Sequence, residues 1–90
     1  MVNFLFFHGT VTAINDFFVT TNNEGEGCYK LLSVENQNRE LVNFVVSPTT
    51  YFVNHAIVSV GDSVTGYYDG DAPVPLIYPP QYRALIMVKE

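Results

Sequence analysis

Few side chains in this chain could bind a transition metal. The chain has two histidines, His8 and His55, and a single cysteine, Cys28. These three residues are widely separated in the sequence. A zinc site needs three or four such ligands, which typically occur at short spacings. Nothing in the spacing of these three residues indicates a shared metal. We therefore expect ordinary half-buried histidines, no metal site and no cofactor.

Carboxylates could instead hold a hard cation such as Ca²⁺, which prefers oxygen ligands. Asp69 and Asp71 flank Gly70, and Asp16 and Asp62 also occur in turn-like segments. The chain lacks the complete pattern of a calcium-binding loop. Because Asp and Gly favour turns, these residues are more typical of a turn that ends a strand.

Nucleophilic catalysis needs a serine, cysteine or threonine beside a positioned base. No elbow motif surrounds any of the serines, which are Ser33, Ser47, Ser59 and Ser63. The glycines at positions 61, 66 and 70 are too far apart to cradle a phosphate. The sequence therefore predicts that this protein is not an enzyme.

Aromatic residues are the most promising candidates for binding, since the chain contains seven Phe and six Tyr. Such rings can stack on a ligand, and they can equally fill a core. Both interpretations stay open for Tyr29, Tyr51, Phe52, Tyr67, Tyr68, Tyr78 and Tyr82.

The charge of the chain limits its partners. The net charge is −5, and the only fixed cations are Lys30, Arg39, Arg83 and Lys89. Nucleic acids and anionic membranes both attract proteins largely through Lys and Arg, so neither is an expected partner. Only 14% of the residues are charged and 48% are hydrophobic, which favours some apolar surface for a partner.

The length of 90 residues predicts one domain, covering residues 1–90. The apolar start, residues 1–7, lacks the basic region and cleavage site of a signal peptide and is too short to span a bilayer. We interpret it as a first strand. A single cysteine excludes an internal disulfide, and together these features favour a cytoplasmic location.

The pattern of residues predicts a domain made of strands. The first expected strand, residues 4–14, contains Gly9 as a bend and ends in a turn at Asn15 and Asp16. Further strands are expected at residues 28–35, 41–47, 63–68 and 82–89. The one expected helical turn, residues 51–55, would be capped by Thr49 or Thr50. Four prolines in residues 71–81 predict a stiff apolar loop.

Alternation along the last strand separates two faces. The face expected to meet the core contains Tyr82, Ala84, Ile86 and Val88. The outer face then contains Leu85 and Met87. Tyr67 would extend that apolar stripe. The expected residues for binding a ligand or partner are therefore Tyr67, Tyr78, Tyr82, Leu85 and Met87.

This order of elements resembles the OB-fold, a five-stranded Greek-key barrel with a short helical turn between strands 3 and 4. The resemblance rests on segments 9–14, 44–49 and 60–68. The "GYYD" at residues 66–69 and the "LIYPPQY" at residues 76–82 are also similar to small bacterial barrel domains of unknown function. The resemblance implies an all-β OB-like barrel and brings no catalytic residues.

The sequence favours a non-catalytic interaction module that binds a protein or peptide, including a second copy of itself as a homo-oligomer. It would use a sheet edge or the proline-containing loop. One alternative is an oligosaccharide or small ligand bound by the tyrosines. A third is single-stranded nucleic acid, which the charge disfavours.

Overall fold

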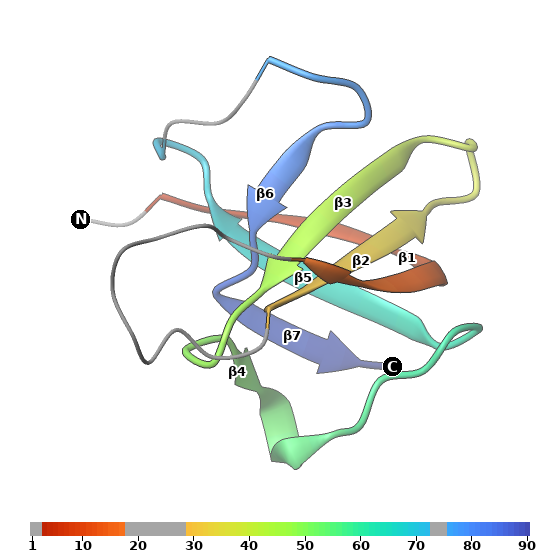
Figure 1. Ribbon diagram of the computed structural model, residues 1–90, viewed down its shortest axis with the longest axis vertical. Coiled ribbons are helices and arrows are strands. Elements are labelled where there is room, and N and C mark those ends of the chain that lie inside the picture. The colour runs from red at the N-terminus through yellow and green to blue at the C-terminus, as the bar shows by residue number, and fades with distance from the viewer. Residues whose placement is uncertain (1–2, 18–28, 73–75) are drawn as a thin grey trace.

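The computed structural model describes residues 3–17, 29–72 and 76–90, and within them the protein is all-β (Figure 1). One mixed sheet contains seven strands in the order β4-β7-β5-β1-β2-β3-β6. The strands are β1 Phe4–Phe17, β2 Tyr29–Glu35, β3 Leu41–Val46, β4 Tyr51–Phe52, β5 Ser63–Asp69, β6 Gln81–Arg83 and β7 Ile86–Lys89. The described sheet is open, since its end strands β4 and β6 are not paired with each other, so the predicted closed barrel of five strands is not supported. No helix in the described ranges is long and apolar enough to cross a membrane.

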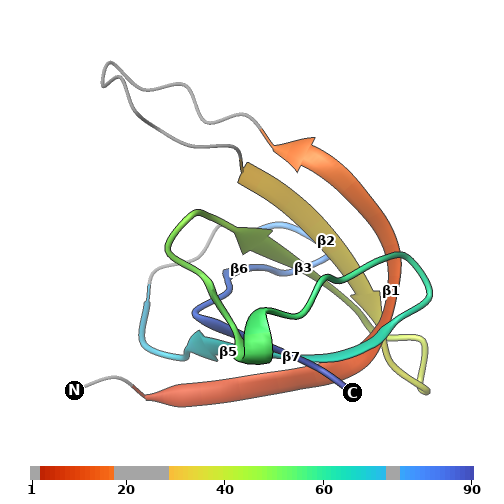
Figure 2. The same cartoon turned by 90° about the horizontal axis from the view of Figure 1, so that it is seen from below.

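β1 is long because it serves two partners in turn. Its residues from Phe4 to Thr10 pair with β5, and those from Thr10 to Phe17 pair with β2. Figure 2 shows that the strand curves strongly along its length. Gly9, the expected bend, lies next to the change of partner, where a Cβ would come within 2.5 Å of the Glu35 carbonyl oxygen. The register also shifts between Val11 and Ala13, as a bulge requires.

The turn predicted at Asn15 and Asp16 is wrong. Both residues belong to β1, where they pair with Leu31 and Lys30 of β2. The Lys30 ammonium forms an ion pair with the Asp16 carboxylate. Pairing with β2 therefore overrides the local preference of Asn and Asp for turns.

The last predicted strand is divided in two. β6 runs parallel to β3, whereas β7 runs antiparallel to β5. Between them, the Ala84 N–H donates to the Val45 carbonyl oxygen of β3 at 3.0 Å, and the Leu85 N–H donates to the Tyr67 carbonyl oxygen of β5 at 2.8 Å. This change of partner interrupts the alternation of faces.

Met87 is consequently in the core. Its side chain is 0% exposed, and Ala84 is also buried although three positions separate the two residues. A single uninterrupted strand would place these residues on opposite faces. The prediction that Met87 lies on the outer face is therefore wrong.

The predicted helical turn is only partly present. Tyr51 and Phe52 form β4, which pairs in parallel with β7. Val53–His55 form a single 3-10 turn, η1, in which Asn54 and His55 have positive φ. Thr50 does not cap it: its hydroxyl donates to the Ala84 carbonyl oxygen at 2.8 Å and accepts from the Ser47 N–H at 3.1 Å.

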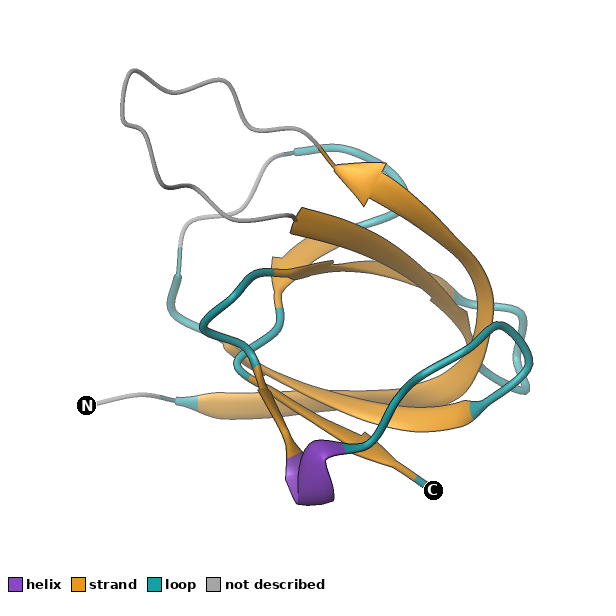
Figure 3. Ribbon diagram, turned by 60° about the horizontal axis from the view of Figure 1, so that its bottom comes forward, coloured by secondary structure: helices purple, strands orange, loops and turns teal. Residues whose placement is uncertain are grey.

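The sheet curls around a core made mainly of valines (Figure 3). Phe44 lies at its centre, fully buried against Gly66 and the ring of Tyr68. The other core residues are Val11, Leu32, Val34, Val42, Val46, Val64, Ala84 and Met87.

Candidate functional site

A row of apolar side chains crosses four strands on the outer face of the sheet. Phe6 of β1 lies opposite Tyr67 of β5, Tyr67 lies opposite Ile86 of β7, and Ile86 lies opposite Tyr51 of β4. Residues paired in this way project from the same face of a sheet. Phe6 and Tyr51, at the two ends, are 63% and 55% exposed. We call Phe6, Tyr67, Ile86 and Tyr51 the aromatic row.

The aromatic row is continuous at its β1 end. The rings of Phe6 and Tyr67 have centroids 6.0 Å apart with an interplanar angle of 43°. This distance and tilt are typical of favourable aromatic pairs. None of the four side chains is charged, so the row can make apolar contacts without removing a charge from water.

A polar network borders the aromatic row on one side. His8, Thr65 and Val88 form the neighbouring set of paired residues. The Thr65 hydroxyl donates to the Glu90 carboxylate at 2.9 Å, so it must accept the 2.9 Å hydrogen bond from Nδ1 of His8. Nδ1 of His8 is therefore the donor atom in this hydrogen bond.

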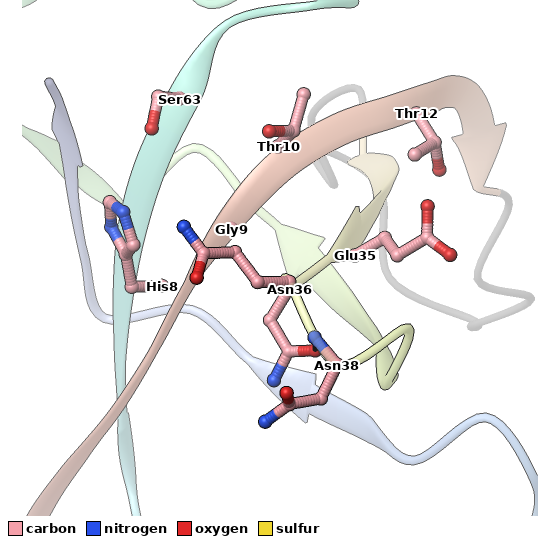
Figure 4. A pocket seen from close by; sticks show the side chains of 9 residues that line it. His8, Gly9, Thr10, Thr12, Glu35, Asn36, Asn38 and Ser63 are labelled. Carbon is pink, nitrogen blue, oxygen red and sulfur yellow. Dashed lines mark hydrogen bonds between the residues drawn. The ribbon is translucent and has the colours of Figure 1, made fainter.

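A polar hollow of about 540 Å³ lies beside this network (Figure 4). Its lining residues come from the bend of β1, the connection between β2 and β3, and the start of β5: His8, Gly9, Thr10, Thr12, Glu35, Asn36, Gln37, Asn38 and Ser63. The Asn36 carboxamide is committed to its own turn, where its oxygen accepts from the N–H groups of Asn38 and Glu40 at 2.9 Å each.

The side chains of this hollow do not form a recognisable reactive pair. His8 and Ser63 both line the hollow and could in principle form a base and a nucleophile. However, Nδ1 of His8 is hydrogen-bonded to the Thr65 hydroxyl and not to Ser63. In the described ranges, no group of three His, Cys, Asp or Glu side chains is placed to hold a metal ion. Cys28, the third metal ligand considered from the sequence, lies outside those ranges.

A second hollow, of about 420 Å³, is lined by aromatic rings. Tyr68 and Tyr82 stack in it with centroids 4.0 Å apart and an interplanar angle of 12°. Tyr78 stands at its rim, 77% exposed. We call it the tyrosine hollow; its lining residues are Phe7, Arg39, Glu40, Leu41, Val42, Tyr68, Tyr78, Pro80 and Tyr82.

The chemistry of the tyrosine hollow combines flat apolar surfaces with two charged groups. Burial raises the pKa of Tyr68, and the adjacent Tyr82 raises it further, so this phenol stays protonated. Arg39 supplies hydrogen-bond donors and Glu40 supplies acceptors among the lining residues. Such a set can hold a small ring with hydroxyl groups.

The structure does not bring the five predicted binding residues into one site. Tyr67 belongs to the aromatic row, whereas Tyr78 and Tyr82 line the tyrosine hollow. Leu85 is half-buried at the break between β6 and β7, and Met87 is in the core.

Sequence reasoning missed Phe6 and Ile86 of the aromatic row, and Arg39 of the tyrosine hollow. Residues 4–7 are all apolar, so they show no alternation that could distinguish exposed Phe6 from Phe7, which packs against the core. Ile86, expected on the core face, lies on the outer face because the last strand is interrupted between β6 and β7. Phe6 and Ile86 are therefore found only through strand register.

The chain matches no family model, curated protein or solved structure with which it was compared.

Proposed function

We propose that this domain is a non-catalytic binding module that docks a protein or peptide on the outer face of its sheet. The aromatic row is the observation that carries the proposal. Contiguous exposed apolar side chains mark interaction sites, and aromatic residues are enriched at the centres of interfaces. The polar network of His8 and Thr65 beside the row supplies the hydrogen-bonding rim that such interfaces have.

Tyr51 provides the sharpest test of this docking face. It is exposed and lies on the two-residue strand β4 at the end of the row, so Tyr51→Ser changes the surface with little effect on the core. Ile57→Ser is the matched control, because Ile57 is 81% exposed and is not part of the row. We expect Tyr51→Ser, but not Ile57→Ser, to weaken binding to a purified partner at least tenfold by calorimetry.

The partner for that titration would be identified by affinity capture with the wild-type chain and confirmed by direct binding of the purified proteins. Equal affinities for wild type and the Tyr51→Ser variant would contradict docking on the aromatic row. A circular dichroism spectrum and a thermal melt of each variant would establish that the fold is unchanged.

The tyrosine hollow supports a second candidate function, binding of an oligosaccharide or another small hydroxylated ligand. Its stacked Tyr68 and Tyr82 and its rim residues Tyr78, Arg39 and Glu40 are the observation that favours it. Sugar rings can stack on aromatic faces while planar polar side chains bond their hydroxyl groups.

Tyr78→Ala would test this candidate. Tyr78 is mostly exposed, so we expect the variant to fold normally and to lose binding to a glycan selected on an array. Leu76→Ala is the matched control, since Leu76 is fully exposed and does not line the hollow. A glycan that binds both variants equally well would exclude the hollow as its site.

An OB-like strand arrangement forms part of the proposal. Three features support it: β1 pairs with both β2 and β5, β3 pairs in parallel with β6, and β7 pairs with β5. Residues 81–89 thereby contact β3 through β6 and β5 through β7. A crystal structure in which residues 81–89 pair with only one of these strands would argue against it.

A further inference from the structure

The first half of β1 has a strand partner on only one side. Phe4 to Thr10 pair with β5, and pairing with β2 begins only at Thr10 (Figure 2). Backbone groups of a strand point alternately to its two sides. In the described chain, the segment Phe4 to His8 therefore has an edge with no strand paired to it.

The hydrogen bonds at both ends of this segment identify which groups lie on the open edge. The Gly70 N–H donates to the Asn3 carbonyl oxygen at 2.8 Å, and the Val11 N–H donates to the Asp62 carbonyl oxygen at 2.9 Å. Odd-numbered residues thus direct their backbone groups toward β5. The N–H and C=O groups of Phe4, Phe6 and His8 point the opposite way, toward the open edge.

Within the described residues, this edge lacks the charged side chains, prolines and bulges that usually prevent strand pairing. Natural edges carry charged side chains, proline or bulges, or are covered by a loop. Residues 3–10 contain no charge and no proline, and the register of Phe4 to Thr10 against β5 is regular. Phe4, Leu5 and Phe6 are all exposed large hydrophobic residues.

We propose that two copies of this chain pair through this edge, with the segments Phe4 to His8 running antiparallel about a twofold axis at Phe6. This inference rests on the proposed protein-binding function and names the partner as a second copy. Under this symmetry, Phe6 exchanges both of its backbone hydrogen bonds with Phe6 of the other copy. Phe4 pairs in the same way with His8, so each open group meets its complement.

The side chains also favour a second copy as the occupant. Phe6 would lie directly opposite the other Phe6, and such cross-strand aromatic pairs are stabilising. The two aromatic rows would join into one row that crosses both sheets.

Charge affects how this dimer responds to salt. Each copy carries a net charge of −5, and none of that charge lies in residues 3–10. Added salt should therefore strengthen the dimer, since it screens the repulsion between the two copies.

Sedimentation equilibrium over a wide concentration range tests the proposal. Pairing through one short edge forms a small interface, so we expect a reversible shift from the 10.1 kDa monomer to twice that mass as concentration rises.

Phe6→Pro removes the N–H at the centre of the edge without removing a hydrogen bond to β5, and it should abolish the shift in mass. Phe6→Lys should also abolish it, because two like charges would meet. A strict monomer at millimolar concentration would overturn the proposal.

Hydrogen exchange in the wild-type chain gives a readout that requires no variant to fold. The amides of Phe6 and His8 should exchange at least tenfold more slowly at high concentration. Those of Leu5 and Phe7 face β5 in the same strand and should not change. A dimer in which Phe6 and His8 gain no protection would place the interface elsewhere and overturn the proposal. Reduced partner binding by Tyr51→Ser would remain a separate result, because Tyr51 lies three strands from this edge.

Discussion

At the scale of single residues, Gly66 occupies a tightly restricted position in the core. A Cβ there would lie 2.7 Å from two ring atoms of Phe44 and 3.0 Å from the sulfur of Met87. Phe44 and Met87 are both fully buried, so neither side chain can move out into solvent. We expect Gly66→Ala to lower the free energy of unfolding by about 1–3 kcal/mol through overpacking.

Gly70→Ala is the matched control for this prediction. Its new Cβ would approach the side chain of Leu5, which is partly exposed and can move away. Urea unfolding of both variants should therefore show the larger loss for Gly66→Ala. Equal losses would indicate that the Phe44 ring does not constrain position 66.

Asp62, in the turn before β5, interacts with Ser59 of the same turn and with Lys89 at the end of β7. Its carboxylate accepts a 2.8 Å hydrogen bond from the Ser59 N–H and lies 3.3 Å from the Lys89 ammonium. These interactions, the backbone bond foremost, lower the pKa of Asp62 below the ordinary value. Because the folded-state pKa is the lower one, the stabilisation is present above the unfolded-state pKa and is lost as pH falls through the folded-state pKa.

Asp62→Asn should therefore destabilise the protein at neutral pH and have little effect in strong acid. Urea unfolding midpoints of both chains, measured from pH 7 to below about pH 3.9, the ordinary aspartate pKa, should converge as pH falls. A difference that stays constant across this range would show that ionisation of Asp62 does not contribute.

At the scale of elements, the break between β6 and β7 determines which residues of the last segment are buried. Met87 is in the core because the strand partner of this segment changes from β3 to β5 at Ala84 and Leu85. We expect Met87→Ala to cost about 2–5 kcal/mol, as truncation of a buried methionine does. Leu85→Ala should cost less, since Leu85 is only half-buried. Thermal and urea unfolding would rank the two, and the reverse order would contradict the assigned faces.

The same break shows where sequence patterns stop being informative. Residue composition correctly indicates strands within residues 4–14 and 63–68, and alternation correctly indicates one within 41–47, where β3 keeps a single register with β2. In residues 82–89 the pattern is equally regular, but the hydrogen bonds of Ala84 and Leu85 to two different strands reverse the faces. Such a change depends on partners distant in sequence, so local alternation cannot predict it. The aromatic row was missed for the same reason, since it exists only through the register of four strands.

At the scale of the whole molecule, the charge distribution supports the expectation that single-stranded nucleic acid is not a partner. Two of its four fixed cations are in ion pairs, Lys30 with Asp16 and Lys89 with Asp62. Arg39 lines the tyrosine hollow beside Glu40. Stacking of bases on tyrosines contributes to single-strand binding together with a positive groove that follows the phosphates. The net charge of −5 opposes that second contribution.

We therefore expect no saturable binding of labelled single-stranded DNA, even at about 20 mM salt, where phosphate contacts are strongest. Fluorescence anisotropy with mixed-sequence and oligothymidine strands would measure the binding.

The triple variant Glu35→Gln, Glu40→Gln, Asp69→Asn provides a sensitive comparison, because it removes three negative charges while it keeps the tyrosine rings. If charge alone prevents binding, this variant should gain weak affinity that decreases as salt rises. Saturable, salt-sensitive binding by the wild-type chain would instead show that single strands bind despite the acidic surface. It would then rank nucleic acid above a neutral ligand as the partner.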